Sequence, residues 1–207
     1  MWSIVSAAGW PIWPLIFASV VAVAIVIERV VALNANKLFP ADLVNDVVRT
    51  LPQFRDVQNI QRLQQHSPLG SILASGLLAW REGKPAEEPM QTRLGQVQHH
   101  MDKHLDVLSL IASASPLMGL LGTVVGMIEI FAVQGATSQT PEALAAGIAV
   151  ALYNTAFGLI VAIPALVAYR LLRIRINNLL NALEDMLLPF EQALDNTRPA
   201  PAQRKAS

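Results

Sequence analysis

Two threonines, Thr123 and Thr155, are the polar residues whose positions best suit a chemical role. Each lies inside a long apolar stretch, and the two stretches are joined by the short segment 133–142. If both stretches cross a bilayer as antiparallel helices, the two hydroxyls lie at similar depth, near the middle of the bilayer. Lipid offers them no hydrogen-bond partner. Each hydroxyl can bond the carbonyl four residues earlier, but the matched depth, with Asn154 adjacent, favours a polar pathway between the helices.

Glu129 is the one charged residue within the first of these two stretches. It lies six residues beyond Thr123, which is about 9 Å along a helix axis. A carboxylate inside a membrane is a candidate for proton transfer, because placing a charge there is costly and such residues usually serve a function. The alternative is an interfacial acid near the outer end of the helix, and the sequence leaves both interpretations open.

Three glycines and two prolines are predicted to shape the same helices. Gly119, Gly122 and Gly126 recur at spacings of three and four, so they share one helix face. Small residues on one face let a second helix approach closely, and helix packing alone explains them. Pro116 and Pro164 lie inside the two stretches, where a proline frees a carbonyl and can bend the helix.

Other site chemistries find little support. The chain has no cysteine, which excludes disulfides and thiolate ligands. His100 and His104, with His99 adjacent, have the spacing of a metal-binding pair, but no third ligand is visible, so we expect no metal site. Nucleotide-binding and hydrolase motifs are missing, and zero net charge argues against a nucleic-acid partner. We therefore expect neither an enzyme nor a cofactor.

The elements that must position these residues are three apolar segments. The sequence is 53% hydrophobic and 14% charged, whereas soluble domains carry about 25% charged residues. Segments 12–33, 107–132 and 143–172 are each long enough to cross about 30 Å of hydrocarbon. The expected fold class is an all-α membrane protein with three transmembrane helices. The second and third helices should continue into a cytoplasmic helical domain.

The distribution of basic residues predicts the orientation of the chain. Residues 1–11 and 133–142 contain no lysine or arginine. The basic residues that flank the apolar segments all fall on the opposite side: Arg29, Lys37, Lys103, Arg170, Arg173 and Arg175. The positive-inside rule therefore places the N-terminus and the 133–142 link in the periplasm, and the C-terminus in the cytoplasm.

Residues 34–106 and 173–196 are then cytoplasmic, and their patterns look helical. The first of these regions carries eight basic and eight acidic residues, as expected of a solvated surface. We expect a helix start at residues 40–42, a break at 67–70, a short amphipathic helix at 72–80 and a loop at 83–89. A helix from Met90 should run unbroken into the second span and pack on an apolar stripe within 174–194. Residues 197–207 are predicted to be disordered.

Two motifs resemble a known family. The run Pro-Leu-Met-Gly-Leu-Leu-Gly-Thr-Val-Val-Gly-Met-Ile at 116–128 resembles the second-span motif of the ExbB/TolQ/MotA proton-channel proteins. The run Gly-Ile-Ala-Val-Ala-Leu-Tyr-Asn-Thr-Ala-Phe-Gly-Leu-Ile-Val-Ala-Ile-Pro at 147–164 resembles their third-span motif. Glu28-Arg29 and the segment 67–70 are also similar to the family, and the resemblance extends over residues 10–193. The three-span layout resembles ExbB or TolQ more than the four-span MotA.

The resemblance implies a homopentamer in the bacterial inner membrane, built around single helices of an ExbD-like partner that supplies a protonatable aspartate. Proton flow would then drive a TonB-like protein and outer-membrane transport. A TolQ-like subunit of the Tol envelope system and a non-conducting membrane scaffold remain alternatives. Thr123 and Thr155 align with the family's pathway threonines. The glutamate common in the family's third span is replaced by Val150, so its role does not transfer, and Glu129 is a candidate to cover part of it.

Overall fold

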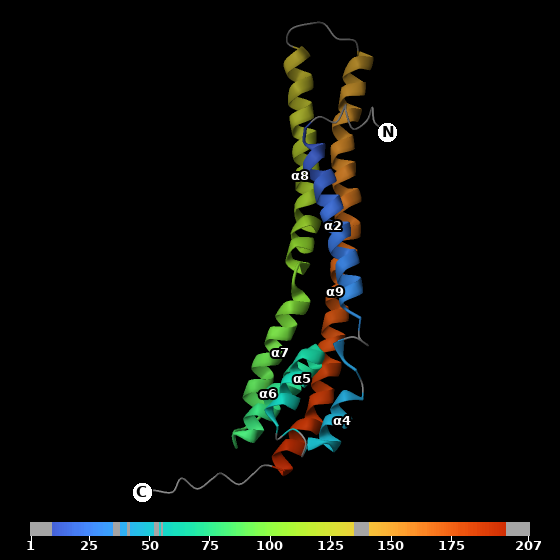
Figure 1. The fold of residues 1–207 in the computed structure, drawn as a ribbon. Coiled ribbons are helices and arrows are strands. Elements are labelled where there is room, and N and C mark those ends of the chain that lie inside the picture. The colour runs from blue at the N-terminus through green and yellow to red at the C-terminus, as the bar shows by residue number, and fades with distance from the viewer. Residues whose placement is uncertain are drawn as a thin grey trace, which may run out of the picture. The chain divides into compact units, whose positions relative to one another are not determined.

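The computed structural model of this 207-residue chain describes residues 10–34, 38–40, 42–51, 54, 56–134 and 141–197. These ranges contain helices and no strand (Figure 1), which confirms the all-α class. The helices are α2 (Ile12–Ala32), α4 (Leu43–Arg49), α5 (Val57–His66), α6 (Pro68–Arg81), α7 (Glu87–Asp102), α8 (Leu105–Gln134) and α9 (Pro141–Asn196). Most of the predicted N-terminal segment 1–11, most of the 133–142 link and most of the 197–207 tail lie outside the described residues.

Three of these helices, α2, α8 and α9, hold stretches long and apolar enough to cross a membrane. Many of their large apolar side chains stay exposed in the single chain, including Phe17 at 71%, Val20 at 63% and Leu117 at 67%. Apolar surface of this kind is unfavourable in water and suits lipid or another membrane helix. The prediction of a three-span membrane protein is therefore confirmed.

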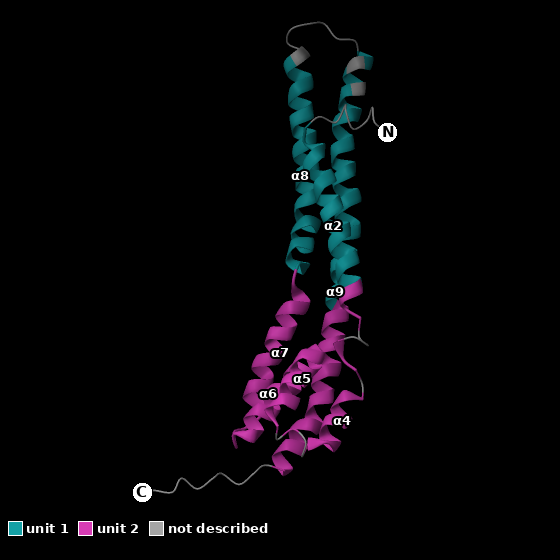
Figure 2. Cartoon of the chain, in the orientation of Figure 1, with its two compact units in different colours: residues 1–30, 104–173 teal, residues 31–103, 174–207 magenta. Residues whose placement is uncertain are grey.

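The chain divides into two compact units (Figure 2). The first unit comprises residues 1–30 and 104–173 and contains most of α2, all of α8 and the first part of α9. The second unit comprises residues 31–103 and 174–207 and contains α4 to α7 and the rest of α9. Helix α9 belongs to both because its 56 residues make a rod of about 84 Å, far more than the roughly 30 Å that a bilayer requires.

In the first unit, α8 and the N-terminal part of α9 lie side by side, with α2 against α9 (Figure 1). The buried residues of α2 are Ile12, Leu15, Ala22, Ile25 and Arg29, which share one face at helical spacing. Side chains of α2 and α9 also line an apolar cavity of about 300 Å³. Packing in this unit therefore leaves large apolar side chains of all three helices exposed.

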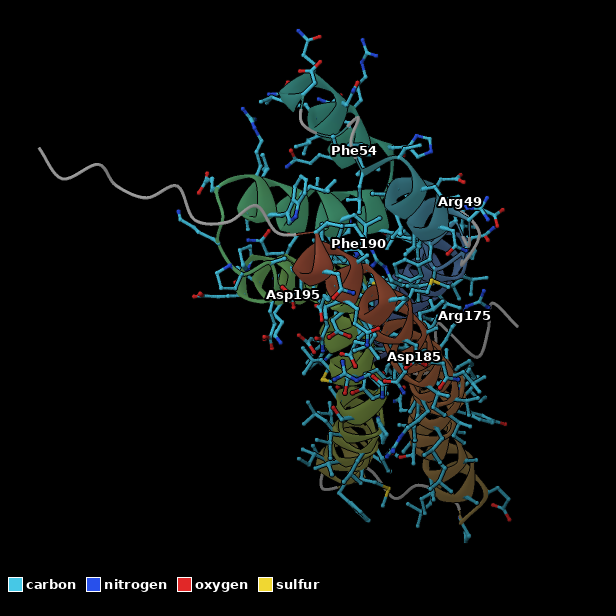
Figure 3. The ribbon with its side chains drawn as sticks, turned by 90° about the horizontal axis from the view of Figure 1, so that it is seen from below. Arg49, Phe54, Arg175, Asp185, Phe190 and Asp195 are labelled. Carbon is cyan, nitrogen blue, oxygen red and sulfur yellow. The ribbon has the colours of Figure 1, made fainter. Side chains whose placement is uncertain are left out.

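In the second unit, α6 is the central helix. Ten of its 14 residues are buried, so it has no polar face. The helix predicted at 72–80 is present, but the prediction that it is amphipathic is wrong, because other helices pack on α6 from several sides. Phe190 of α9 is fully buried in this unit (Figure 3), and a methyl group placed on Gly76 of α6 would lie 3.3 Å from its ring and 2.5 Å from the sulfur of Met90 in α7. Phe190 of the predicted C-terminal stripe and Met90 therefore both lie against α6, and Leu187 of the stripe lines a common cavity with Met90.

The helix boundaries of the second unit follow from local capping. Ser67 ends α5 and caps α6, because its Oγ accepts a hydrogen bond of 3.0 Å from the backbone N–H of Gly70, with Pro68 in the first turn. The predicted break thus occurs at Ser67 alone, and residues 68–70 are helical. The loop predicted at 83–89 is shorter than expected, because α7 already begins at Glu87.

The expected unbroken helix from Met90 into the second span is interrupted. Helix α7 ends at Asp102 and α8 begins at Leu105. Between them His104 has φ of +67°, a left-handed conformation that a right-handed helix cannot contain. His104 Nδ1 lies 2.8 Å from Glu28 Oε2, a contact within the first unit. His100 and His104 therefore do not face one another on successive helical turns.

Candidate functional site

The candidate site is the contact between α8 and α9 in the first unit, and glycines bring these helices together. A methyl group placed on Gly119 would fall 2.7 Å from the carbonyl oxygen of Asn154 and 3.1 Å from the Cα atoms of Gly158 and Thr155. A methyl group on Gly158 would fall 2.6 Å from the carbonyl oxygen of Ser115. Glycines on both helices therefore allow backbone-to-backbone contact, which larger side chains would prevent.

This close approach joins the two threonines that the sequence singled out. The Oγ1 atoms of Thr123 and Thr155 are 2.5 Å apart, a hydrogen bond in which either hydroxyl can be the donor. The Thr123 hydroxyl also lies 3.2 Å from the carbonyl oxygen of Gly119, four residues earlier, and 3.1 Å from that of Ala151 on α9. The Thr155 hydroxyl lies 3.4 Å from the Gly119 carbonyl oxygen. The Thr123 hydroxyl therefore lies within hydrogen-bonding distance of a carbonyl of its own helix and of the Thr155 hydroxyl on α9 at the same time.

The hydrogen bonds of this pair can run in two directions. Each threonine hydroxyl has one hydrogen to donate. If Thr155 donates to Thr123, then Thr123 donates to a backbone carbonyl, either Gly119 or Ala151. If Thr123 donates to Thr155, then Thr155 donates to the Gly119 carbonyl. Both arrangements satisfy both hydroxyls, so the pair can reverse its polarity by rotating two O–H bonds.

Further buried polar groups lie beside the threonine pair. Asn154 is 2% exposed, and a methyl group on Gly122 would touch its side chain at 2.9 Å. Ser115, also 2% exposed, donates a 2.7 Å hydrogen bond to the carbonyl of Ile111. At Gly126 the helices are less tightly packed, because a methyl group placed there would lie 3.2 Å from Ala151 Cβ. The glycine face predicted on α8 thus lies against α9 at all three of its positions.

The other predicted site residues are not gathered at this contact. Glu129 is exposed, and it forms no ion pair or hydrogen bond with any residue that the structure describes. Pro116 lies inside α8 and is half-buried. Pro164 lies inside α9, is exposed, and lines the apolar cavity against α2. Val150 is half-buried, one residue before the carbonyl that Thr123 contacts.

Some features of the site were not anticipated. Gly158 and Ser115 complete the close contact, and the three-residue spacing of Gly158 from Thr155 is the signal that could have revealed it. Arg29 is 4% exposed and its Nη2 lies 2.7 Å from Glu28 Oε1, so this pair is partly internal to the first unit. No group of three His, Cys, Asp or Glu side chains within the described ranges is arranged to hold a metal ion.

Comparison with known proteins identifies a family whose profile covers the contact between α8 and α9. Residues 64–185 match the profile of the MotA/TolQ/ExbB proton channel family, and this range includes the whole glycine and threonine contact. Biopolymer transport protein exbB1 of Vibrio cholerae is 31% identical over 186 residues, covering 86% of this chain and 82% of that protein. Tol-Pal system protein TolQ of Haemophilus influenzae is 45% identical over 78 residues, covering 37% and 34%. Biopolymer transport protein ExbB of Aquifex aeolicus is 40% identical over 79 residues, covering 37% and 53%.

Proposed function

Because the chain belongs to the MotA/TolQ/ExbB proton channel family, we propose that it is a proton-channel subunit that converts the proton-motive force into mechanical work. The observation that supports this is the 2.5 Å contact between the hydroxyls of Thr123 and Thr155. It forms between two helices able to span a membrane, where a hydroxyl pair of reversible polarity suits the relay of a proton. Asn154 and Glu129 are the further residues that we assign to the path.

The proton itself must be held by another group, and we propose that a partner supplies it. Hydroxyls relay protons, but a relay through a membrane also needs a titratable group or a water chain. The described parts of α8 and α9 hold no acid at the depth of the threonines. An ExbD-like single-span protein with a membrane aspartate fits this requirement. One charge crossing the membrane releases about 2.3 kcal/mol per 100 mV, so a few protons per cycle suffice for conformational work.

The assembly that we propose is a homopentamer in the bacterial inner membrane, enclosing the partner helices and passing force to a TonB-like protein. The exposed apolar side chains of α2, α8 and α9 support it, because they need lipid or neighbouring helices as cover. The basic residues near the C-terminal end of α2 and in the middle of α9 support a periplasmic N-terminus and a cytoplasmic C-terminus.

Two alternatives compete with this assignment. A TolQ-like role in the Tol system is supported by the 45% identity to the Haemophilus influenzae protein, although that match covers 78 residues only. Rescue of TonB-dependent uptake or of envelope integrity, in cells lacking one system or the other, separates these two roles. A non-conducting scaffold would use the same glycine contact without a proton path.

Proton flux into liposomes that contain the chain and its partner tests the proposal. Thr123→Val and Thr155→Val remove a hydroxyl at nearly constant volume, so each should lower flux at least tenfold and leave the mass of the complex unchanged. Thr92→Val is the matched control, since Thr92 is an exposed helical threonine whose hydroxyl donates to the carbonyl four residues earlier, at 3.0 Å. Full flux in both membrane variants would refute the path, and absence of flux from the wild-type complex would favour the scaffold.

A further inference from the structure

The second unit contains a cavity of about 500 Å³, lined by both polar and apolar side chains, that the proposed proton path does not use. It lies where α5 ends, α6 begins and α7 passes by. Its polar lining includes one arginine, two histidines and three glutamines: Arg93, His66, His100, Gln64, Gln65 and Gln96. The size is that of a small-molecule site, and it is far larger than one water molecule, whose share of liquid volume is about 30 Å³.

Arg93 is the residue that gives this cavity its chemistry, and it is held in place by neutral groups. Its Nε donates to Ser71 Oγ at 3.3 Å, and its Nη1 donates to Gln96 Oε1 at 2.6 Å. Ser71 is only 6% exposed and donates in turn to the carbonyl of Pro68 at 2.7 Å, so it anchors the guanidinium to the first turn of α6. A guanidinium has five N–H donors, and these two bonds leave the others available.

The charge around the cavity is of one sign. Among the residues that the structure describes, none that lines the cavity is acidic, and no carboxylate forms an ion pair with Arg93. This is unusual in a chain whose 15 basic residues are matched by 15 acidic ones. The imidazoles of His66 and His100 add further N–H donors. A planar, anchored guanidinium with adjacent donors and no competing carboxylate suits a phosphate group, which it can bind in bidentate fashion.

We propose that this cavity binds the phosphate group of an anionic organic phosphate, with Arg93 as the principal ligand and His66 and His100 as additional donors. The apolar lining residues Leu38, Val97 and Met101 suit an organic part beyond the phosphate, and the cavity has room for one. A phospholipid headgroup and a soluble phosphate ester share this chemistry. His100 lies five residues before α8 in the chain, and this short separation makes a membrane lipid one of the two sources to test.

Native mass spectrometry of the full, delipidated chain in detergent tests this proposal with three probes. Dioctanoyl phosphatidylglycerol carries the phosphate on a lipid, sn-glycerol 3-phosphate carries it in water, and dioctanoylglycerol has the acyl chains without the phosphate. Arg93→Gln removes the guanidinium, and Arg62→Gln is the matched control, because Arg62 is exposed on α5 and does not line the cavity. We expect at least one phosphate probe to saturate the wild type and the control, and Arg93→Gln to weaken it about tenfold or more.

The outcomes separate the sources and can overturn the proposal. Binding of the phospholipid alone identifies a headgroup site, and equal binding of glycerol 3-phosphate identifies a soluble ester. Equal affinity of Arg93→Gln and Arg62→Gln, no saturable binding of either phosphate probe, or binding of dioctanoylglycerol as tight as that of the phospholipid would each overturn it. If circular dichroism shows that Arg93→Gln loses helix content, a His66→Gln/His100→Gln double variant provides the same comparison with Arg93 intact.

Discussion

Gly119→Ala tests whether α8 and α9 approach as closely as the threonine contact requires. The added methyl carbon would lie 2.7 Å from the carbonyl oxygen of Asn154, whereas ordinary contacts begin at 3.4 Å. The atoms it meets are backbone atoms of α9, which cannot rotate aside. The helices must therefore separate locally by about 0.7 Å to accept the methyl group, because packed interiors have no slack of that size.

The effect on the site follows from this displacement. A separation of about 0.7 Å lengthens the Thr155 contact with the Gly119 carbonyl from 3.4 Å to about 4.1 Å, beyond hydrogen-bonding distance. Overpacking lowers the free energy of unfolding by about 1–3 kcal/mol, whereas the better helix propensity of alanine raises it by up to about 1 kcal/mol. Gly95→Ala on α7 is the matched control, since a methyl group there meets nothing within 4 Å.

Thermal unfolding in one detergent measures the difference between the two variants. Helix propensity cancels between them, so Gly119→Ala should be less stable than Gly95→Ala by the overpacking cost alone. For a chain of this size that corresponds to a midpoint lower by roughly 2–12 °C. Gly126→Ala should fall between them, because its nearest contact is a side-chain carbon at 3.2 Å. Equal midpoints for Gly119→Ala and Gly95→Ala would show that the helices are not in backbone contact.

Three further variants test other parts of the structure. Glu129→Gln should reduce proton flux several-fold. Its unfolding midpoint should stay unchanged, because the carboxylate is exposed and makes no stabilising contact with described residues. Unchanged flux would leave Glu129 as an interfacial acid. Phe190→Ala should destabilise the second unit by about 3–5 kcal/mol, since Phe190 is 0% exposed, whereas Leu188→Ala, 55% exposed, should cost far less. Denaturant titration followed by the fluorescence of buried Trp80 would measure both, and similar midpoints would contradict the assigned core. His104→Gly should be more stable than His104→Ala by about 1 kcal/mol. Both variants lose the Glu28 contact, so they differ only in how well the new residue tolerates a φ of +67°. Equal stability of the two variants in calorimetry would argue against the left-handed turn.

The three membrane spans and the pairing of the threonines were within reach of the sequence. The hydropathy of a run such as residues 12–33 depends only on its own residues, so the run identifies a membrane span without knowledge of what it packs against. The depth of Thr123 and Thr155 follows from counting residues back to one short link, because every helical residue rises by the same amount. The capping serine at position 67 is likewise a local signal, since its partner lies three residues away.

Other features depend on contacts between segments that are far apart in the sequence. Gly158 matters because it faces Gly119 at a particular rotation of two helices, and no local pattern specifies that rotation. The amphipathic expectation for residues 72–80 failed because burial is set by how many helices surround α6. The break at His104 and the cavity around Arg93 were also invisible, since each involves partners 22 or more residues away, Glu28 and Ser71. Local periodicity thus establishes which segments are helices and how deep their residues lie, whereas the relative rotation of those helices decides which of those residues meet.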